Sequence, residues 1–403
     1  MSRPQFEVAD VIRRYEENFL DAYGDSVSFQ RRHILNSLAV CRTEALGGRV
    51  LECDNQCGHQ EISCNSCRNR HCPKCQASLS ADWVQARRED LLDVLYFHLV
   101  FTLPGELVGL AIQNKAVLYD LLFQASSQTL QQIAADPKHL GAQIGFLGVL
   151  HTWGQNLMHH PHVHYVVPGG GISPDGSRWI ASRSKFFLPV RVLSRLFRGK
   201  FLDGLRRAFD QKKLSFHGQL IDLEQPDAFT ALLRNARRHD WVVYAKPPFG
   251  GPDQVLKYLA RYTHRVAISN RRILSIDDGK VSFSWKNYTN GNARREMALD
   301  ASEFIRRFLL HTLPKGFVRI RHYGFLANRV RKAKLELCRQ LIGTPPPDSG
   351  SDHDKANPDS QDARPDQCPA CDEGRLIRTR NIDPSPTRTT NFSKNRPRAP
   401  DTS

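Results

Sequence analysis

A histidine-rich segment near the middle of the chain carries the clearest arrangement of residues able to do chemistry. It reads His159-His160-Pro161-His162-Val163-His164-Tyr165-Val166-Val167. Alternate residues of a β-strand point to the same face, so His162 and His164 should project together while Val163 packs on the other side. Two imidazoles on one face are a ligand pair for a metal ion. The spacing therefore predicts a metal site on this strand.

A second predicted strand, upstream of the first, offers a third ligand. It places His151, Trp153 and Gln155 on one face. If the two strands are neighbours, either His151 or Gln155 can complete the site. Each of these two also has an ordinary interpretation as a hydrogen-bonded sheet residue.

A pair of tyrosines forms the second chemical feature. Tyr258 and Tyr262 are four residues apart in a predicted helix over 253–263 and so lie on the same helix face. A phenol with a pKa near ~10 can attack phosphorus only if a metal or base activates it. The alternative is that both rings pack in the core. Cations that suit a phosphodiester surround the pair: Lys257, Arg261, His264 and Arg265.

Cysteine is concentrated between residues 53 and 75. Two Cys-x2-Cys pairs and one Cys-x3-Cys pair lie there, and such turns point two thiolates at one tetrahedral ion. We expect zinc, with an iron–sulfur cluster as the alternative. A segment this short has little core, so metal binding would supply its folding energy. The candidate ligands are Cys53, Cys57, Cys64, Cys67, His71, Cys72 and Cys75.

The grouping of these ligands does not follow from the sequence. The first choice closes Cys53 and Cys57 with Cys72 and Cys75, and leaves Cys64, Cys67 and His71 for a second site or for packing. The basic residues Arg68 and Arg70 between the pairs are candidates for DNA phosphate contacts or for a solvated surface.

The other four cysteines give no strong signal for a metal site. In the tail, Cys368 and Cys371 form a lone pair with only His353 nearby, which is a weak signal for a site. Cys41 and Cys338 lie in helical patterns and are expected to be small hydrophobes.

Hydrophobic patterns predict the elements that position these residues. Two helices are expected within 5–46, and a buried strand over 95–102 is ended by Pro104. Further strands are expected over about 143–153 and 162–168, with shorter ones within 264–287. Strands and helices alternate from about 90 to 340, which indicates an α/β or α+β domain. Helices are expected over 80–93, 106–135, 189–213, 301–310 and 324–341.

Composition narrows the functional class. The chain has 403 residues, a net charge of +16 and 40% hydrophobic residues, so it can build a core and should bind a polyanion such as nucleic acid. No apolar run is long enough for a membrane span, and no secretory signal is evident, so we expect a soluble cytoplasmic protein. The tail from 344 to 403 is rich in Pro, Ser, Asp and Arg and is expected to be disordered.

Taken together, these motifs resemble a known family. Phe101-Thr102-Leu103-Pro104, His162-Val163-His164 and Tyr258-x3-Tyr262 follow the order of the three motifs of HUH endonucleases. With the cysteine knuckles at 65–76 and the stretches 150–155, 261–265 and 319–325, they resemble the two-tyrosine rolling-circle transposases of the insertion-sequence ninety-one family, bacterial relatives of Helitrons. The resemblance covers about residues 30–343.

The resemblance implies an α+β fold with a central antiparallel sheet, the histidine pair on a middle strand and the tyrosine helix packed across it. It implies Mg²⁺ or Mn²⁺ held by His162, His164 and a third polar ligand, beside structural Zn²⁺. The expected domains are an N-terminal helical region, a zinc-binding module, an HUH two-tyrosine transposase domain and a disordered tail, over 1–49, 50–80, 90–343 and 344–403.

The implied chemistry is cleavage of single-stranded DNA at transposon ends and target. One tyrosine forms a 5′-phosphotyrosine and leaves a free 3′-OH, and the second allows alternating strand transfer. No Gly-x4-Gly-Lys-Ser/Thr motif is present, so host replication or helicase machinery is an expected partner, with no membrane, in a bacterial cytoplasm close to the nucleoid.

Three other functions remain as alternatives. A rolling-circle replication initiator or relaxase would share the chemistry. A non-enzymatic zinc-finger DNA-binding regulator would use the histidines and tyrosines as core residues. A carboxylate-triad transposase would need three clustered acidic residues, and nothing in 140–300 singles out such a set.

Overall fold

The computed structural model describes residues 4–183, 187–249, 254–255, 266–287, 293–343, 367–371 and 373–385. Tyr258 and Tyr262 lie outside these ranges. The basic residues expected beside them also lie outside the described residues: Lys257, Arg261, His264 and Arg265.

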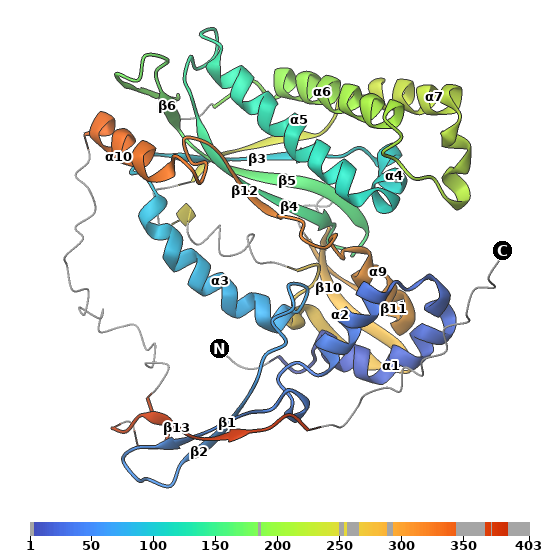
Figure 1. Ribbon diagram of the computed structural model, residues 1–403, viewed down its shortest axis with the longest axis vertical. Coiled ribbons are helices and arrows are strands. Elements are labelled where there is room, and N and C mark those ends of the chain that lie inside the picture. The colour runs from blue at the N-terminus through green and yellow to red at the C-terminus, as the bar shows by residue number, and fades with distance from the viewer. Residues whose placement is uncertain are drawn as a thin grey trace, which may run out of the picture.

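A five-stranded antiparallel sheet forms the centre of the molecule (Figure 1). The histidine strand β5 is its middle strand, which confirms the expected antiparallel sheet and the place of the histidine pair. The order is β12 (Ile320–Gly324), β4 (Gly145–Trp153), β5 (His159–Pro168), β3 (Tyr96–Thr102) and β8 (Val243–Phe249).

Four helices cover one face of this sheet (Figure 1). The strand residues that point to them are apolar and fully buried, as Val163 and Tyr165 on β5 and Leu99 on β3 show. Because side chains alternate along a strand, this apolar set forces the histidines onto the opposite face. The helices are α4 (Val108–Gln113), α5 (Lys115–Ala135), α6 (Val190–Asp210) and α7 (Pro226–Arg237).

The opposite face is apolar at one end and histidine-rich at the other. At the apolar end Tyr96, Leu147 and Val166 form a small core, and Trp83 of α3 (Pro73–Arg87) packs against it. Toward the other end of the same strands lie the histidines. The histidines therefore lie on the sheet face opposite helices α4 to α7.

The N-terminal helices pack on a second, smaller sheet. Its order is β11 (Ala293–Asp300), β10 (Lys280–Asn287) and β9 (Ile273–Asp277), and α9 (Ala301–Leu310) lies against it. The helices are α1 (Val8–Tyr23) and α2 (Phe29–Ala39), which share one buried core with this sheet and α9. The Val8 amide donates to Asn270 Oδ1 over 3.1 Å, which ties the start of the chain to its second half.

A third sheet lies at the edge of the molecule (Figure 1). Its order is β13 (Leu376–Ile382), β1 (Gly48–Cys53) and β2 (Gln60–Cys64). β13 belongs to the tail that was expected to be disordered, so for this stretch the expectation does not hold. Local composition favoured disorder because the tail has few apolar residues, but strand pairing with β1 orders this part of it.

Several elements escaped the sequence patterns. β8, β12 and α7 were not predicted, whereas the strand expected over 95–102 and the helix over 301–310 are found as β3 and α9. The remaining elements are α10 (Arg331–Ile342) and the short pair β6 (Gly170–Ile172) and β7 (Trp179–Ala181). Within the described part of the chain, none of the helices has the length and apolar character needed to cross a membrane.

Candidate functional site

Three imidazoles meet at the histidine-rich end of the central sheet. His151 of β4 pairs directly with His162 of β5, and His164 follows on the same face. The ligating nitrogens of the three side chains all lie within 4.8 Å of one another. The ring centres of His151 and His164 are 4.4 Å apart, and those of His162 and His164 are 4.8 Å apart. This spacing suits three ligands of one ion.

β4 ends between His151 and Gln155, the two candidates for the third ligand. The strand register shifts between His151 and Trp153, and β4 ends at Trp153. Gln155 lies beyond this end, in the turn that leads to β5, and its carbonyl accepts a hydrogen bond from Arg272. Strand alternation, which made Gln155 an alternative to His151, therefore does not extend to position 155.

Desolvation favours the neutral form of His162 and His164. Desolvation lowers the pKa of His162 to about 4 and that of His164 well below its ordinary value. A neutral imidazole retains a lone pair for a metal ion, whereas an imidazolium does not. His162 Nδ1 also lies 2.6 Å from the carbonyl oxygen of His160, which orients the ring with Nδ1 as the donor. The lone pair of His162 is then on Nε2.

A fourth histidine, His98 of β3, was not predicted. His98 is buried, and its Nε2 lies 2.8 Å from Nδ1 of His164. Desolvation, together with the nearby charge of Lys246, lowers the pKa of His98 to about 3. In the sequence, His98 lies in an apolar run that predicts only a buried strand. Thr102 of the same strand pairs with His162, and alternate residues share a face, so His98 lies on the face of the histidine site.

The neighbouring edge strand β8 adds a cation and a phenol to this face. Lys246 pairs with His98, and Tyr244 pairs with Val100, so both share the histidine face. Both side chains are exposed. A polyanionic ligand that reaches the histidines from this side meets positive charge first.

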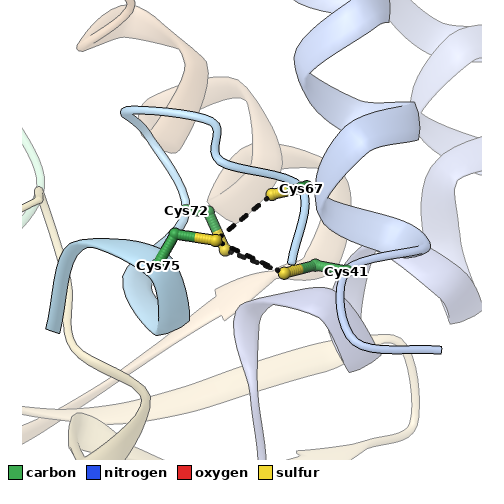
Figure 2. Close-up of side chains that lie close together, drawn as sticks. All are labelled: Cys41, Cys67, Cys72 and Cys75. Carbon is green, nitrogen blue, oxygen red and sulfur yellow. Dashed lines mark hydrogen bonds between the residues drawn. The ribbon is translucent and has the colours of Figure 1, made fainter. Parts of the chain in front are cut away.

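Four thiols from three parts of the chain form a first cysteine cluster (Figure 2). Cys41 follows α2, Cys67 lies in a loop, and Cys72 and Cys75 stand at the start of α3. The sulfur of Cys41 is 3.6 Å from those of Cys72 and Cys75. A tetrahedral ion with Zn–S bonds of ~2.3 Å would separate its sulfurs by about 3.8 Å. The donor set and its spacing are those of a structural zinc site.

A second cluster of four thiols joins the module to the tail. It consists of Cys53, Cys57, Cys368 and Cys371, whose sulfurs also lie within 4.8 Å of one another. Of these four cysteines, the sequence predicted only Cys53 and Cys57 as zinc ligands, because Cys368 and Cys371 gave a weak signal.

These clusters differ from the expected grouping. Cys72 and Cys75 close with Cys41 and Cys67, not with Cys53 and Cys57. Cys41, interpreted as a small hydrophobe, is a cluster member, while Cys64 on β2 belongs to neither cluster. A lone cysteine after a helix carries no local ligand pattern, so only tertiary packing reveals it.

His71 is also outside both clusters, for a specific reason. Its Nε2 accepts a hydrogen bond from the Leu313 amide at 3.2 Å. Arg70 beside it donates to the carbonyls of Pro314 and Phe317, at 2.6 and 2.7 Å. Both side chains therefore tie the cysteine module to the main domain, whereas Arg68 is exposed. DNA contact stays a prediction for Arg68 and Arg70.

Two known protein families match successive parts of the chain. The family described as "Putative transposase" matches residues 145–334, which include the histidine strands. The family described as "Transposase zinc-binding domain", named for the insertion-sequence ninety-one transposases, matches residues 11–103, which include the whole first cysteine cluster. The chain thus contains a transposase zinc-binding domain followed by a transposase domain.

Two relatives cover most of the chain. It is 54% identical over 382 residues to "Putative transposase y4qJ" of Sinorhizobium fredii, covering 94% of this chain and 96% of the relative. It is 30% identical over 298 residues to the "Transposase for insertion sequence element IS801" of Pseudomonas savastanoi pv. phaseolicola, covering 73% and 70%.

A solved structure, the metal-bound conjugative relaxase TrwC in complex with oriT DNA, is 12% identical with a TM-score of 0.24 and covers 58% of this chain and 94% of its own. Membership is decided by the two relatives and the two family matches. The chain therefore belongs to the insertion-sequence ninety-one family of transposases.

Proposed function

We propose that this transposase cuts and rejoins single-stranded DNA through tyrosine–phosphate bonds at the histidine site. The observation that carries the proposal is the meeting of His151, His162 and His164 on the face of the central sheet opposite helices α4 to α7. The net charge of +16 and the exposed Lys246 beside the site favour a nucleic-acid substrate.

The three imidazoles fit a divalent ion. They are neutral donors, so they would leave the charge of a bound Mg²⁺ or Mn²⁺ uncompensated and able to attract a phosphodiester. Nitrogen donors favour Mn²⁺ over Mg²⁺. When bound, such an ion would supply Lewis acidity at a phosphate oxygen.

The covalent step uses the chain's own tyrosines. The phenol oxygen of Tyr258 or Tyr262 attacks phosphorus and loses its proton, and the bond from phosphorus to the 3′ oxygen breaks. The products are a 5′-phosphotyrosine and a free 3′-OH. A 3′-OH of another strand then attacks the phosphotyrosine and restores the phenol, so bond energy is conserved without ATP. The second tyrosine permits a second transfer.

A denaturing gel tests this function directly. The purified chain is incubated with single-stranded oligonucleotides from the element's ends, with Mg²⁺ or Mn²⁺ or with a chelator. We expect a protein–DNA conjugate that survives denaturation, that requires the metal, and that is absent from the Tyr258→Phe/Tyr262→Phe double variant, which still binds DNA.

Tyr244→Phe is the matched control, because Tyr244 is an exposed phenol on the same sheet face and should be dispensable. Metal-independent DNA binding without any conjugate would instead support a zinc-finger regulator. A conjugate formed equally well on sequences unrelated to the ends would favour a replication initiator or relaxase.

The His98–His164 contact makes a separate prediction about metal affinity. To ligate through Nε2, His164 must carry its proton on Nδ1 and donate it to Nε2 of His98, 2.8 Å away. Such outer partners typically raise metal affinity 10–100-fold. His98→Ala should therefore weaken Mn²⁺ binding by roughly this factor, measured by calorimetry, without lowering zinc content.

The His98→Gln variant separates positioning from packing. Glutamine retains an acceptor, so it should recover part of the lost Mn²⁺ affinity, whereas an equally large apolar residue, as in His98→Leu, should recover none. Equal Mn²⁺ affinity in the alanine variant and the parent would contradict the proposed tautomer.

A further inference from the structure

The second cysteine cluster joins two segments that are far apart in the sequence. The sulfurs of Cys57 and Cys368, 311 positions apart, are separated by 3.6 Å. Those of Cys53 and Cys371 are also 3.6 Å apart. Each segment contributes a short-spaced pair, Cys-x3-Cys from the module and Cys-x2-Cys from the tail. The matched zinc-binding domain ends at residue 103, so half of this ligand set lies outside it.

The backbone around the four thiols is built to bring them together. The Asp54 amide donates to the Arg375 carbonyl at 2.9 Å, and the Arg375 amide donates to Asp54 Oδ1 at 2.6 Å. The Gly374 amide donates to the sulfur of Cys371 at 3.3 Å, a bond that stabilises a thiolate. A Cβ atom at Gly374 would come within 2.3 Å of the Cys53 sulfur, so the tail approaches the module as closely as its backbone permits.

The third sheet, which lies beside the cluster, needs the contact between the tail and the module. β1 lies between β2 and β13, so without the tail it would be the edge of a two-stranded hairpin, which is marginally stable in water. Few side chains form a core there. Val50 is buried, but Ile62 is 63% exposed and Ile377 is 49% exposed. Hydrophobic burial alone is therefore a weak source of stability for this sheet.

We propose that Cys53, Cys57, Cys368 and Cys371 bind a second structural Zn²⁺, and that this ion fastens the C-terminal strand β13 onto the zinc-binding module. Four thiolates at tetrahedral spacing are a closed site with no open position for a substrate. The role of the ion is to complete the third sheet. The proposal does not depend on the DNA chemistry.

Zinc content gives the first test. The full-length chain, purified without added chelator, should contain two zinc ions per chain by elemental analysis, and Cys368→Ser/Cys371→Ser should contain one. Cys64→Ser is the matched control, since Cys64 is a thiol of the same module outside both clusters, and it should keep two. Cys371→His, which restores a zinc ligand, should also keep two.

Protection of β13 gives the second test and does not depend on purification yield. Trypsin sites lie at the strand: Arg375 directly precedes β13, and Arg378 and Arg380 lie within it. In the double serine variant, or after zinc chelation, we expect faster cleavage there and loss of hydrogen-exchange protection over 376–382. The same amides should stay protected in Cys64→Ser.

Three results would overturn the proposal. One is a parent chain with a single zinc ion. Another is a double serine variant that keeps both ions. The third is protection of β13 that a reductant abolishes and a chelator leaves unchanged, which would identify disulfides in place of the ion. If the serine variant does not fold, the parent stoichiometry and the Cys371→His variant still decide the question.

Discussion

Replacing His162 with alanine should abolish the protein–DNA conjugate. His162 supplies one of three imidazoles that converge within 4.8 Å, and a site with two ligands should lose its ion. A bound metal ion stabilises the transition state by several kcal/mol, and each ~1.4 kcal/mol is a tenfold change in rate. We therefore expect cleavage to fall by at least about 10²–10³-fold, measured as conjugate formed per minute at fixed Mn²⁺.

The loss should be specific to the ligand and not to the fold. His162 is only partly buried, so its removal leaves a small cavity and should change the melting temperature little. His322→Ala is the matched control: His322 of β12 pairs with Leu147, lies on the same sheet face and is outside the triad. Near-normal turnover in His162→Ala, or an equal loss in His322→Ala, would refute the assignment of the ion to this triad.

Cys72→Ser should unfold the core that the N-terminal helices share with the small sheet. Cys72, Cys75 and Cys41 are buried in the same core as α1, α2 and the small sheet, so a zinc ion held by these thiols would lie inside a hydrophobic core. Structural zinc contributes on the order of 10–16 kcal/mol of binding free energy in zinc-finger peptides, which is comparable with the whole stability of a domain, about 5–15 kcal/mol. We expect loss of zinc together with loss of cooperative thermal unfolding.

Cys338→Ser provides the comparison for this variant. Cys338 is equally buried, in α10, but lies outside both clusters. Its replacement buries a hydroxyl and should cost only about 1–3 kcal/mol while zinc content stays unchanged. If Cys72→Ser kept its zinc and melted like Cys338→Ser, the first cluster would not be a zinc site.

The sequence by itself determined the local geometry of the site. A strand repeats every two residues, so His162 and His164 had to share a face, and Val163 between them had to turn to the other side. The strand at 95–102 was predicted from its apolar run and from Pro104 after it, whereas the antiparallel sheet was implied by the family resemblance. The motifs that carried the family resemblance are equally local, which is why they could be recognised without a structure.

Only the tertiary structure decided which distant residues complete each site. His151 reaches the histidine pair through the register of β4 on β5, and His98 reaches it from β3. Cys41 joins the first cluster from the end of α2, and the tail brings two thiols to the second from 311 positions away. Spacing predicts neighbours along one strand or turn. Which strands pair, and which loops meet, depends on burial summed over the whole chain, and no local pattern contains that sum.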